Sequence, residues 1–560
     1  MALTLLRAPW PALAASDEPH RFEVRDSIEM SYFGTRDASA PDDLDDDGVF
    51  SPDGRHFVKL THRGVLPQGV TEGTLWVFDT AAVERTLREP KLEVPKPVPV
   101  VRMAASVNGG LGIDVLDAGN TITAPQWSEN GRSLTFLGRD GRINRQLFRV
   151  DLDTGAVKAL TPSNQDVLAY ARSGSDFVYL RGADADLQAV QAWTSAGPDI
   201  PDMAVGTGTP LMPLLYPHFK GNAYTEPLAI EVWRVHDDRA APVVDSGTGG
   251  PIRLITRYTS LLISLSPDVT RAVAIGEYNV SDADNDPPKD TASVAATLHY
   301  LEIDLRSGHT TPLDQVRIAK PAGRYRAAWA PDGSHIAVTE VQMSRDIGSQ
   351  GQTPLCEIAL LRVETTDAQC ISLHDQKNAK DAIFALDWPH ADQIHARYKV
   401  FRQSTYSDLM LYRKGSAWIM DARPPADKRS ALALSVRESL NEPPALFASN
   451  RGTSRSRKIF DPNPQLAAMA LGSVSVFHWK DPHGREDIGG LVTPPGFTLG
   501  KRYGLVIQTH GFNPRQFFRV GYSDTSNAGR ALAGRDLLVL QVREPDSDQQ
   551  IGRASCRERV

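Results

Sequence analysis

The chain has 560 residues, of which 41% are hydrophobic and 23% charged, and its formal net charge is −7. This length allows two or more domains with sizeable cores, and the negative balance gives no electrostatic reason to expect nucleic-acid binding. No run of about 18 apolar residues occurs, so no membrane-spanning helix is predicted.

The first twenty residues, "MALTLLRAPWPALAASDEPH", end like a secretory signal, with an Ala-Leu-Ala triplet before Ala15. Their apolar stretch is interrupted by Arg7 and two prolines. Two interpretations therefore remain open. If residues 1–15 are the remnant of a signal peptide, the protein is periplasmic or secreted; if they are a flexible alanine-rich start, it is cytoplasmic.

A short unit recurs between about residues 45 and 450. An apolar or aromatic residue precedes a polar turn, and an alternating apolar run follows, as in "VFSPDGRHFVKLTHRG" (49–64), "PQWSENGRSLTFLGRDG" (125–141) and "AAWAPDGSHIAVTEVQ" (327–342). Proline pre-sets the turn, Asp or Asn caps it, and Gly accepts a positive φ. The alternating run predicts a half-buried strand.

Some units continue into a hairpin, as in "LFRVDLDTGAVKALTP" (147–162) and "LHYLEIDLRSGHTTPL" (298–313). Two intervals between turns are long enough to hold weakly marked copies. We therefore expect an all-β propeller of seven or eight blades, with Trp127, Trp329 and Trp388 buried between blades. An irregular two-sheet sandwich is the alternative.

Two cysteines and one acidic segment lie within this repeated region. Cys356 and Cys370 flank a predicted hairpin, where they form either a disulfide in an oxidising compartment or two unpaired core thiols. Residues 281–293 are acidic but lack the ligand spacing of an EF-hand, so we expect a surface loop. Neither His-Glu-x-x-His nor Cys-x-x-Cys occurs, and we expect no metal and no cofactor.

The pattern changes after "FDPNPQL" (460–466). Residues 474–497 predict a hairpin, and "RYGLVIQTHG" (502–511) predicts a buried strand. A helix is predicted over about 524–534 and another strand over 537–542. This strand–helix–strand order predicts a βαβ unit of a parallel sheet.

A propeller followed by "WKDPHGREDIGGLVTPPGFTLGKRYGLVIQTHG" resembles the prolyl oligopeptidase family of serine peptidases, including its dipeptidyl peptidase IV-like and acylaminoacyl peptidase branches. The likeness reaches the level of motifs only in about residues 474–542. It implies an N-terminal segment and propeller over residues 16–460. Residues 461–550 would then be the incomplete start of an α/β-hydrolase domain.

The resemblance also implies a serine nucleophile, a histidine base, an orienting carboxylate and an oxyanion-binding loop. The loop is "THGFNPRQFF" (509–518), with His510, Gly511, Phe512 and Asn513 as candidates. Family members often have His-Gly-Gly here, so which backbone N–H serves is open. In the alternative interpretation, Gly511 only makes the turn after the strand.

No Gly-x-Ser-x-Gly occurs in the 560 residues. The near misses around Ser454 and Ser523 are interpreted as ordinary loop serines. In the family, the catalytic serine, acid and histidine follow the strand that corresponds to residues 537–542. We therefore expect no catalytic residue in this chain and all three beyond residue 550.

The last ten residues, "IGRASCRERV" (551–560), are basic and include a lone Cys556. They back-translate into a string that resembles a short-read sequencing adapter. We expect a translated adapter that truncates the reading frame; a natural basic tail is the alternative. The chain itself is then expected to be inactive.

The parent protein is expected to hydrolyse peptide bonds through an acyl-enzyme. The expected partner is a peptide substrate, without nucleic acid or a membrane span, and a homo-oligomer is compatible with the sequence. One alternative is a lasso-peptide isopeptidase of the same family. The other is a non-enzymatic, TolB-like propeller that serves as a binding module.

Overall fold

The structure is a computed structural model that describes residues 19–34, 49–106, 120–182, 228–257, 261–277, 298–318, 325–343, 355–373, 381–400, 405–421, 432–450, 455–508 and 529–542, together with Phe512, Pro514, Gln516 and Phe517. Within these ranges, residues 142–143, 364, 366, 416, 481–483 and 485 are outside the described part. The predictions for residues 1–15, 281–293 and 551–560 also lie outside it. The chain forms two compact units.

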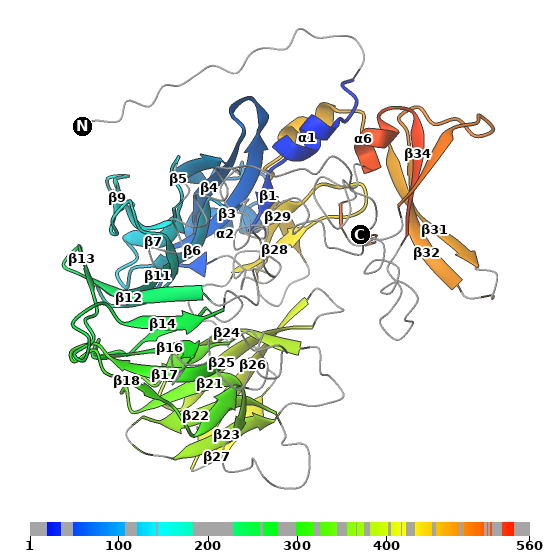
Figure 1. The fold of residues 1–560 in the computed structure, drawn as a ribbon. Helices are drawn as coiled ribbons and strands as arrows, with labels where there is room; N and C mark the ends of the chain where they lie inside the picture. The colour runs from blue at the N-terminus through cyan, green and yellow to red at the C-terminus, as the bar shows by residue number, and fades with distance from the viewer. Residues whose placement is uncertain are drawn as a thin grey trace, which may run out of the picture. The chain divides into compact units, whose positions relative to one another are not determined.

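The larger unit, residues 32–436 and 447–460, is built almost entirely of strands (Figure 1). Its first sheet contains β1 (Tyr32–Phe33), β2 (Val49–Phe50), β3 (His56–Val65), β4 (Val70–Asp79) and β5 (Val98–Ser106). The second sheet contains β6 (Ile122–Trp127), β7 (Ser133–Gly138), β8 (Gln146–Asp151) and β9 (Val157–Ala159). The third sheet contains β10 (Val167–Ser173), β11 (Asp176–Gly182), β12 (Leu228–His236), β13 (Arg239–Pro242) and β14 (Arg253–Thr256). The 3-10 helix η1 (Leu66–Gln68) and helix α2 (Thr80–Arg88) lie in the first of these segments.

Four further sheets follow in chain order. The fourth sheet contains β15 (Ile263–Leu265), β16 (Arg271–Glu277), β17 (Leu298–Asp304) and β18 (Thr310–Pro312), and the fifth contains β19 (Val316–Ile318), β20 (Ala327–Trp329), β21 (His335–Met343), β22 (Cys356–Arg362) and β23 (Ala368–Leu373). The sixth sheet contains β24 (Asp381–His390), β25 (Gln393–Val400), β26 (Thr405–Lys414) and β27 (Ala417–Asp421). The seventh sheet contains β28 (Leu432–Arg437), β29 (Ala445–Asn450) and β30 (Ser456–Phe460). The described residues of the repeated region thus form seven sheets.

Three of the recurring turns share one hydrogen-bond pattern, over residues 51–56, 128–133 and 266–271. In each, the hydroxyl of the first serine donates to the Asp or Asn two residues later and accepts the backbone N–H five residues later. The fourth position has a positive φ and is Gly54, Gly131 or Val269. The turn chemistry read from the sequence therefore produces these hairpins.

Hydrophobic clusters fill the space between consecutive sheets, from the first to the sixth. Trp127 and Trp329 are 8% and 6% exposed, which confirms the prediction for these two residues. Trp388 also packs against the cluster between the fifth and sixth sheets, but it is half-buried where full burial was predicted. Trp388 packs edge-on against Trp418 and lines two cavities, so part of its surface stays accessible.

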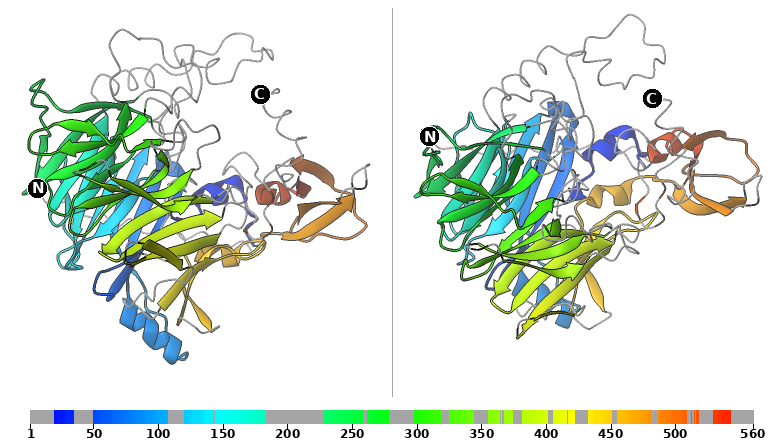
Figure 2. Two further views of the ribbon diagram at one scale, coloured as in Figure 1. Left: turned by 90° about the horizontal axis from the view of Figure 1, so that it is seen from below. Right: turned by 60° about the horizontal axis from the view of Figure 1, so that its bottom comes forward.

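The last sheet of the series contacts the first. The ring of Phe460 in β30 lies 5.0 Å from Trp76 and 5.8 Å from Phe78, measured between ring centroids. Arg457 donates to the carbonyl oxygen of Thr86 in α2 at 2.9 Å. The seven sheets therefore form a propeller-like series whose last sheet packs against its first, and Figure 2 shows the sheets from two further directions.

The long interval between the third and fourth turns does not add a sheet among the described residues. The third sheet continues from β11 to β12, and the intervening residues 183–227 are outside the described part. The seventh sheet, in contrast, lacks the turn signature altogether.

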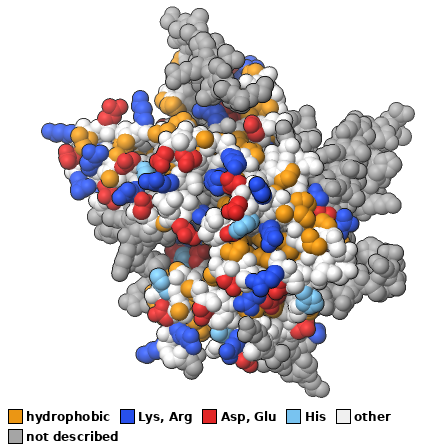
Figure 3. Space-filling model, turned by 90° about the vertical axis from the view of Figure 1, so that its left-hand side faces the viewer, with side chains coloured by type: hydrophobic (Ala, Val, Ile, Leu, Met, Phe, Trp, Pro, Cys, Tyr) orange, Lys and Arg blue, Asp and Glu red, His pale blue; other side chains and the backbone are white. Residues whose placement is uncertain are grey.

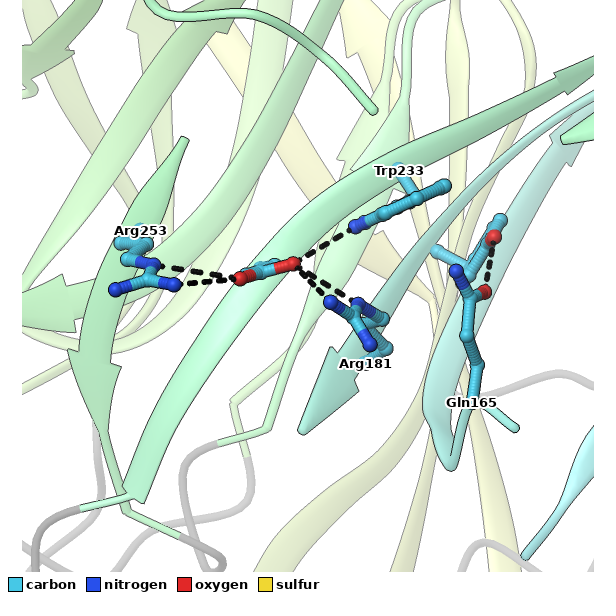
Figure 4. A network of polar contacts seen from close by, with 6 residues as sticks. Gln165, Arg181, Trp233 and Arg253 are labelled. Atoms are coloured by element: carbon cyan, nitrogen blue, oxygen red, sulfur yellow. Dashed lines mark hydrogen bonds and ion pairs between the residues drawn. The ribbon is translucent and has the colours of Figure 1, made fainter. Parts of the chain in front are cut away.

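A buried ion-pair network lies in the third sheet (Figure 4). Glu231, 2% exposed, accepts hydrogen bonds from Arg181 Nη2 at 2.6 Å and Trp233 Nε1 at 3.1 Å on one oxygen, and from Arg253 Nη2 at 3.2 Å on the other. Burial alone would raise the pKa of Glu231, but hydrogen bonds from Trp233 and Arg181 outweigh burial and lower it. Glu231 therefore stays ionised and ties β11, β12 and β14 together.

Cys356 in β22 and Cys370 in β23 form a disulfide, with 5.8 Å between their Cα atoms. The two strands are antiparallel neighbours, as the predicted hairpin requires. Of the two interpretations left open by the sequence, the structure shows the bonded one.

The smaller unit, residues 1–31, 437–446 and 461–555, contains a sheet of different topology. Its elements are α1 (Val24–Glu29), the 3-10 helix η5 (Pro464–Ala468), β31 (Ser473–Lys480), β32 (Glu486–Thr493), β33 (Gly504–Gln508), α6 (Gly529–Ala533) and β34 (Leu537–Val542). The strand order is β31-β32-β34-β33, and β33 and β34 are parallel. The predicted hairpin and the strand–helix–strand unit are thus both present.

Candidate functional site

The candidate site is the loop between β33 and α6 in the smaller unit. The register Gly504↔Leu537 to Gln508↔Gln541 brings the carboxyl ends of β33 and β34 to one edge of the sheet. In α/β sheets, ligands bind at this edge. Of the four predicted oxyanion-loop residues, His510, Gly511 and Asn513 are outside the described residues, and Phe512 is described.

Phe512 anchors this loop in the core. It is 5% exposed and packs with Val492 and Val539. A Cβ added to Gly490 would lie 2.5 Å from the Phe512 ring, so β32 needs glycine there. The Phe512 N–H donates to the carbonyl oxygen of Val542 at 3.3 Å. An oxyanion donor in this loop would therefore come from a residue other than Phe512.

A second anchor is Arg530 in α6, which is fully buried. It donates to the carbonyl oxygens of Leu471 at 2.9 Å and Leu440 at 2.6 Å, and its guanidinium lies 4.4 Å from the centroid of the Phe517 ring. Burial lowers the pKa of Arg530 to about 10, so it remains charged at neutral pH. The Phe517 N–H in turn donates to Glu438 Oε2 at 2.9 Å. Nothing in the helical pattern of the sequence distinguished Arg530 from a solvent-exposed arginine.

Gln541 lies on the same sheet edge with an unsatisfied amide. It is fully buried, and neither side-chain polar atom has a hydrogen-bond partner among the residues that the structure describes. It stands opposite Gly490 on β32 and Gln508 on β33, on the sheet face that carries Phe512. A buried unpaired amide costs about 1–3 kcal/mol, so its position beside the candidate loop is unusual.

The larger unit has a separate cavity of about 560 Å³ where strands β6, β10, β15, β20 and β24 converge. Trp127, Trp329 and Trp388 line it, together with Glu129 and Arg172. Arg172 donates to the carbonyl oxygen of Gly174 at 2.7 Å and to that of Trp127. The cavity thus combines aromatic surface with charges of both signs. Figure 3 shows that Lys and Arg are interspersed with Asp and Glu on one face of the molecule as well.

Among the described residues, no group of three or more His, Cys, Asp or Glu side chains is placed to hold a metal ion. None of the described helices is long and apolar enough to cross a membrane.

Comparison with known proteins gives one curated sequence relative. The lasso peptide isopeptidase AtxE2 of Asticcacaulis excentricus is 30% identical over 122 residues, which are 22% of this chain and 17% of the isopeptidase. No known protein-family model matches the chain.

Three similar solved structures cover most of this chain. AtxE2 without ligand has a TM-score of 0.44 and 16% identity, over 95% of this chain and 67% of AtxE2. An acylaminoacyl peptidase of Pyrococcus horikoshii has a TM-score of 0.46 and 10% identity, over 93% of this chain and 66% of its own. A prolyl endopeptidase has a TM-score of 0.40 and 10% identity, over 92% of this chain and 62% of its own.

The chain thus spans about two thirds of the length of these structures, and its sequence match covers a much smaller part of the isopeptidase. By their names, these similar proteins are a lasso peptide isopeptidase, an acylaminoacyl peptidase and a prolyl endopeptidase.

Proposed function

We propose that the parent protein is a serine hydrolase that cleaves peptide or isopeptide bonds through an acyl-enzyme. The observation that most directly supports this proposal is the position of the candidate loop between β33 and α6. In α/β-hydrolases one oxyanion donor comes from the loop between the third strand and the first helix. Here β33 is the third strand of its sheet in chain order, and the loop after it leads to α6.

In this proposal a serine attacks the carbonyl carbon, a histidine takes the serine's proton, and a carboxylate orients the histidine. The loop N–H groups stabilise the negative charge on the carbonyl oxygen. The 560 residues contain no Gly-x-Ser-x-Gly. We therefore place the serine, acid and histidine on sequence that the parent gene encodes after Gln550.

The surface of the smaller unit supports this placement. Leu505 and Ile507 lie on one face of β33 and are 53% and 59% exposed. Among the described residues, β33 pairs only with β34. Strands of parallel sheets are normally paired on both edges and covered on both faces. Further strands and helices of a hydrolase domain would supply that pairing and cover.

The larger unit would control access as a seven-bladed propeller, with its inner cavity on the path of the peptide. The disulfide between Cys356 and Cys370 favours an oxidising compartment, so we propose a periplasmic or secreted protein. A TolB-like binding module remains the competing function, but such a module has no need of the smaller unit's mixed sheet.

An isopeptidase is the more specific candidate, because the relative found by sequence is a lasso peptide isopeptidase. A solved variant of that relative has Astexin3-dC4 bound.

The test is to extend the chain after Gln550 with the residues encoded at the source locus. Aminoacyl and dipeptide chromogenic substrates and an isopeptide-linked lasso peptide are then assayed side by side.

We expect the extended chain to turn over at least one substrate class and the 560-residue chain to turn over none. Cleavage of the lasso peptide alone would identify an isopeptidase, and cleavage of the chromogenic substrates a peptidase. A folded extended chain that cleaves nothing would favour the binding module. Ser454→Ala and Ser523→Ala serve as controls, because both serines are expected to be dispensable.

A further inference from the structure

A second cavity of the larger unit, of about 810 Å³, lies where the fourth, fifth and sixth sheets meet. Its volume falls within the range of ligand pockets, which is roughly 300–1,000 Å³. Its lining includes His335, Arg362, Trp388, Arg413 and Trp418. This cavity is separate from the cavity of about 560 Å³ described above, although Trp388 lines both.

Two arginines in the lining of this cavity have no counter-ion among the described residues. Arg362 and Arg413 are exposed, and neither forms an ion pair within the described part of the chain. His335 stands opposite Arg362 in the β21–β22 register. Burial first, and then the charges of both arginines, lower the pKa of His335, although Asp332 opposes the shift. The positive charges of both guanidinium groups therefore act on the His335 imidazole.

Aromatic surface lies beside these arginines. Trp418 stands opposite Arg413 in the β26–β27 register. The rings of Trp388 and Trp418 meet at 84°, with 5.7 Å between centroids. Such a pair presents a rigid apolar wall next to the two cations.

Three acidic residues also line the cavity, namely Glu302, Asp314 and Asp367. Glu302 lies 3.6 Å from Arg271 in an ion pair, and Asp314 also has interactions within the structure. The Asp367 carbonyl oxygen accepts the Arg362 N–H at 3.0 Å, but the Asp367 carboxylate forms no ion pair with either arginine. The Arg413 Nε donates to the carbonyl oxygen of Gly415 at 3.3 Å. An added carboxylate would therefore supply the counter-ion that both guanidinium groups lack within the described residues. Guanidinium groups bind carboxylates in a planar, two-bond geometry that ammonium groups cannot reproduce.

We propose that this cavity binds a peptide that carries a carboxylate next to an aromatic or other apolar side chain. Arg362 and Arg413 would bind the carboxylate, and Trp388 and Trp418 would contact the apolar side chain. This site lies in the larger unit alone and goes beyond the proposed hydrolase activity, so it can fail or hold independently of that activity.

The test uses the 560-residue chain and four fluorescein-labelled peptides, with binding measured by fluorescence anisotropy. The peptides end in Trp-Glu or Trp-Gln, each with a free carboxylate or an amide at the C-terminus. The variant is Arg362→Ala/Arg413→Ala. Arg132→Ala is the matched control, because Arg132 is an exposed arginine, with its side chain 74% accessible, that lies outside this cavity. Thermal unfolding verifies that both variants remain folded.

We expect the Trp-Gln amide to bind about tenfold or more weakly than the peptides with a carboxylate. The double variant should lose this preference, and Arg132→Ala should keep it. Comparison of the two singly charged peptides tells a C-terminal carboxylate from an acidic side chain. The proposal is overturned by absence of binding, by equal binding of all four peptides, or by a preference that survives in the folded double variant.

Discussion

Among single residues, two buried polar side chains differ in whether they have hydrogen-bond partners. Glu231 is buried with all its partners in place, whereas Gln541 is buried with none among the described residues. The first arrangement stabilises the larger unit. The second costs stability at the edge of the sheet where we place the site.

Glu231→Ala should lower the free energy of unfolding of the larger unit by about 3–5 kcal/mol, because it removes the carboxylate that binds Arg181, whose side chain is 7% accessible. Arg253→Ala is the control. The Arg253 side chain is 69% accessible, so its loss should cost about 1 kcal/mol or less. Denaturant titration of both variants checks the prediction, which equal losses would refute.

Gln541→Met should stabilise the smaller unit by about 1 kcal/mol, because it removes an unpaired buried amide at nearly constant volume. Gln146→Met is the contrasting variant, since Gln146 is 7% exposed and donates to the carbonyl oxygen of Thr161 at 2.6 Å. It should destabilise the larger unit. Chemical denaturation compares the two, and a loss of stability in Gln541→Met would show that the amide is satisfied in solution.

His395 gives a prediction on pH. Burial alone would lower its pKa, but Asp387 and Asp408 outweigh burial and raise it to about 9. The native state therefore holds the proton more tightly than the unfolded state, where histidine titrates near about 6.5. The stabilisation is complete below that pH and disappears as pH rises through about 9. The melting temperature of wild type should exceed that of His395→Gln at pH 6, and this difference should shrink by pH 10. A constant difference would contradict the assignment.

At the scale of elements, the hairpins were predictable where turn chemistry is local. The Ser-x-Asp/Asn pattern reports a hydrogen-bond network within six residues, so sequence alone identified the strands on either side. Helix α2 was missed, although Asp79 caps it by accepting the N–H of Ala82 at 2.7 Å. The seventh sheet lacks the turn, and tertiary packing of Phe460 against the first sheet defines it instead. The half-burial of Trp388 depends on two cavities that no local pattern encodes.

Removal of the disulfide should also act at this scale. It closes a short loop, with a sequence separation of 14 residues, and a loop of this size contributes about 3 kcal/mol by restricting the unfolded chain. Cys356→Ala/Cys370→Ala should therefore shift the unfolding midpoint of the larger unit downward. Cys556→Ser should leave it unchanged. A double variant as stable as wild type would show that the bond does not form in solution.

At the scale of the whole molecule, the two units differ in how completely they bury their strands. In the larger unit the last sheet packs against the first. The smaller unit leaves Leu505 and Ile507 exposed on one face of β33. The sequence predicted the βαβ unit because its apolar runs are continuous, but it could not show which faces lack cover.

Leu505→Lys/Ile507→Lys should reduce aggregation of the 560-residue chain, because the variant replaces exposed apolar surface by charge. In the chain extended after Gln550 the same change should impair folding, since we expect that face to be covered there. Val539→Lys is the control and should disrupt both chains, as Val539 is fully buried. Light scattering measures aggregation, and chemical denaturation measures stability. If both chains tolerate Leu505→Lys/Ile507→Lys equally well, added sequence does not cover this face of β33.

We propose that this chain carries the oxyanion loop of a serine hydrolase whose nucleophile follows Gln550. The most direct measurement is labelling of the 560-residue and extended chains with a fluorophosphonate probe, with the adduct located by mass spectrometry. We expect one labelled serine, in a Gly-x-Ser-x-Gly of the added sequence, and no label on the 560-residue chain. A stoichiometric adduct on any serine within residues 1–550, or no adduct on a folded extended chain, would contradict it.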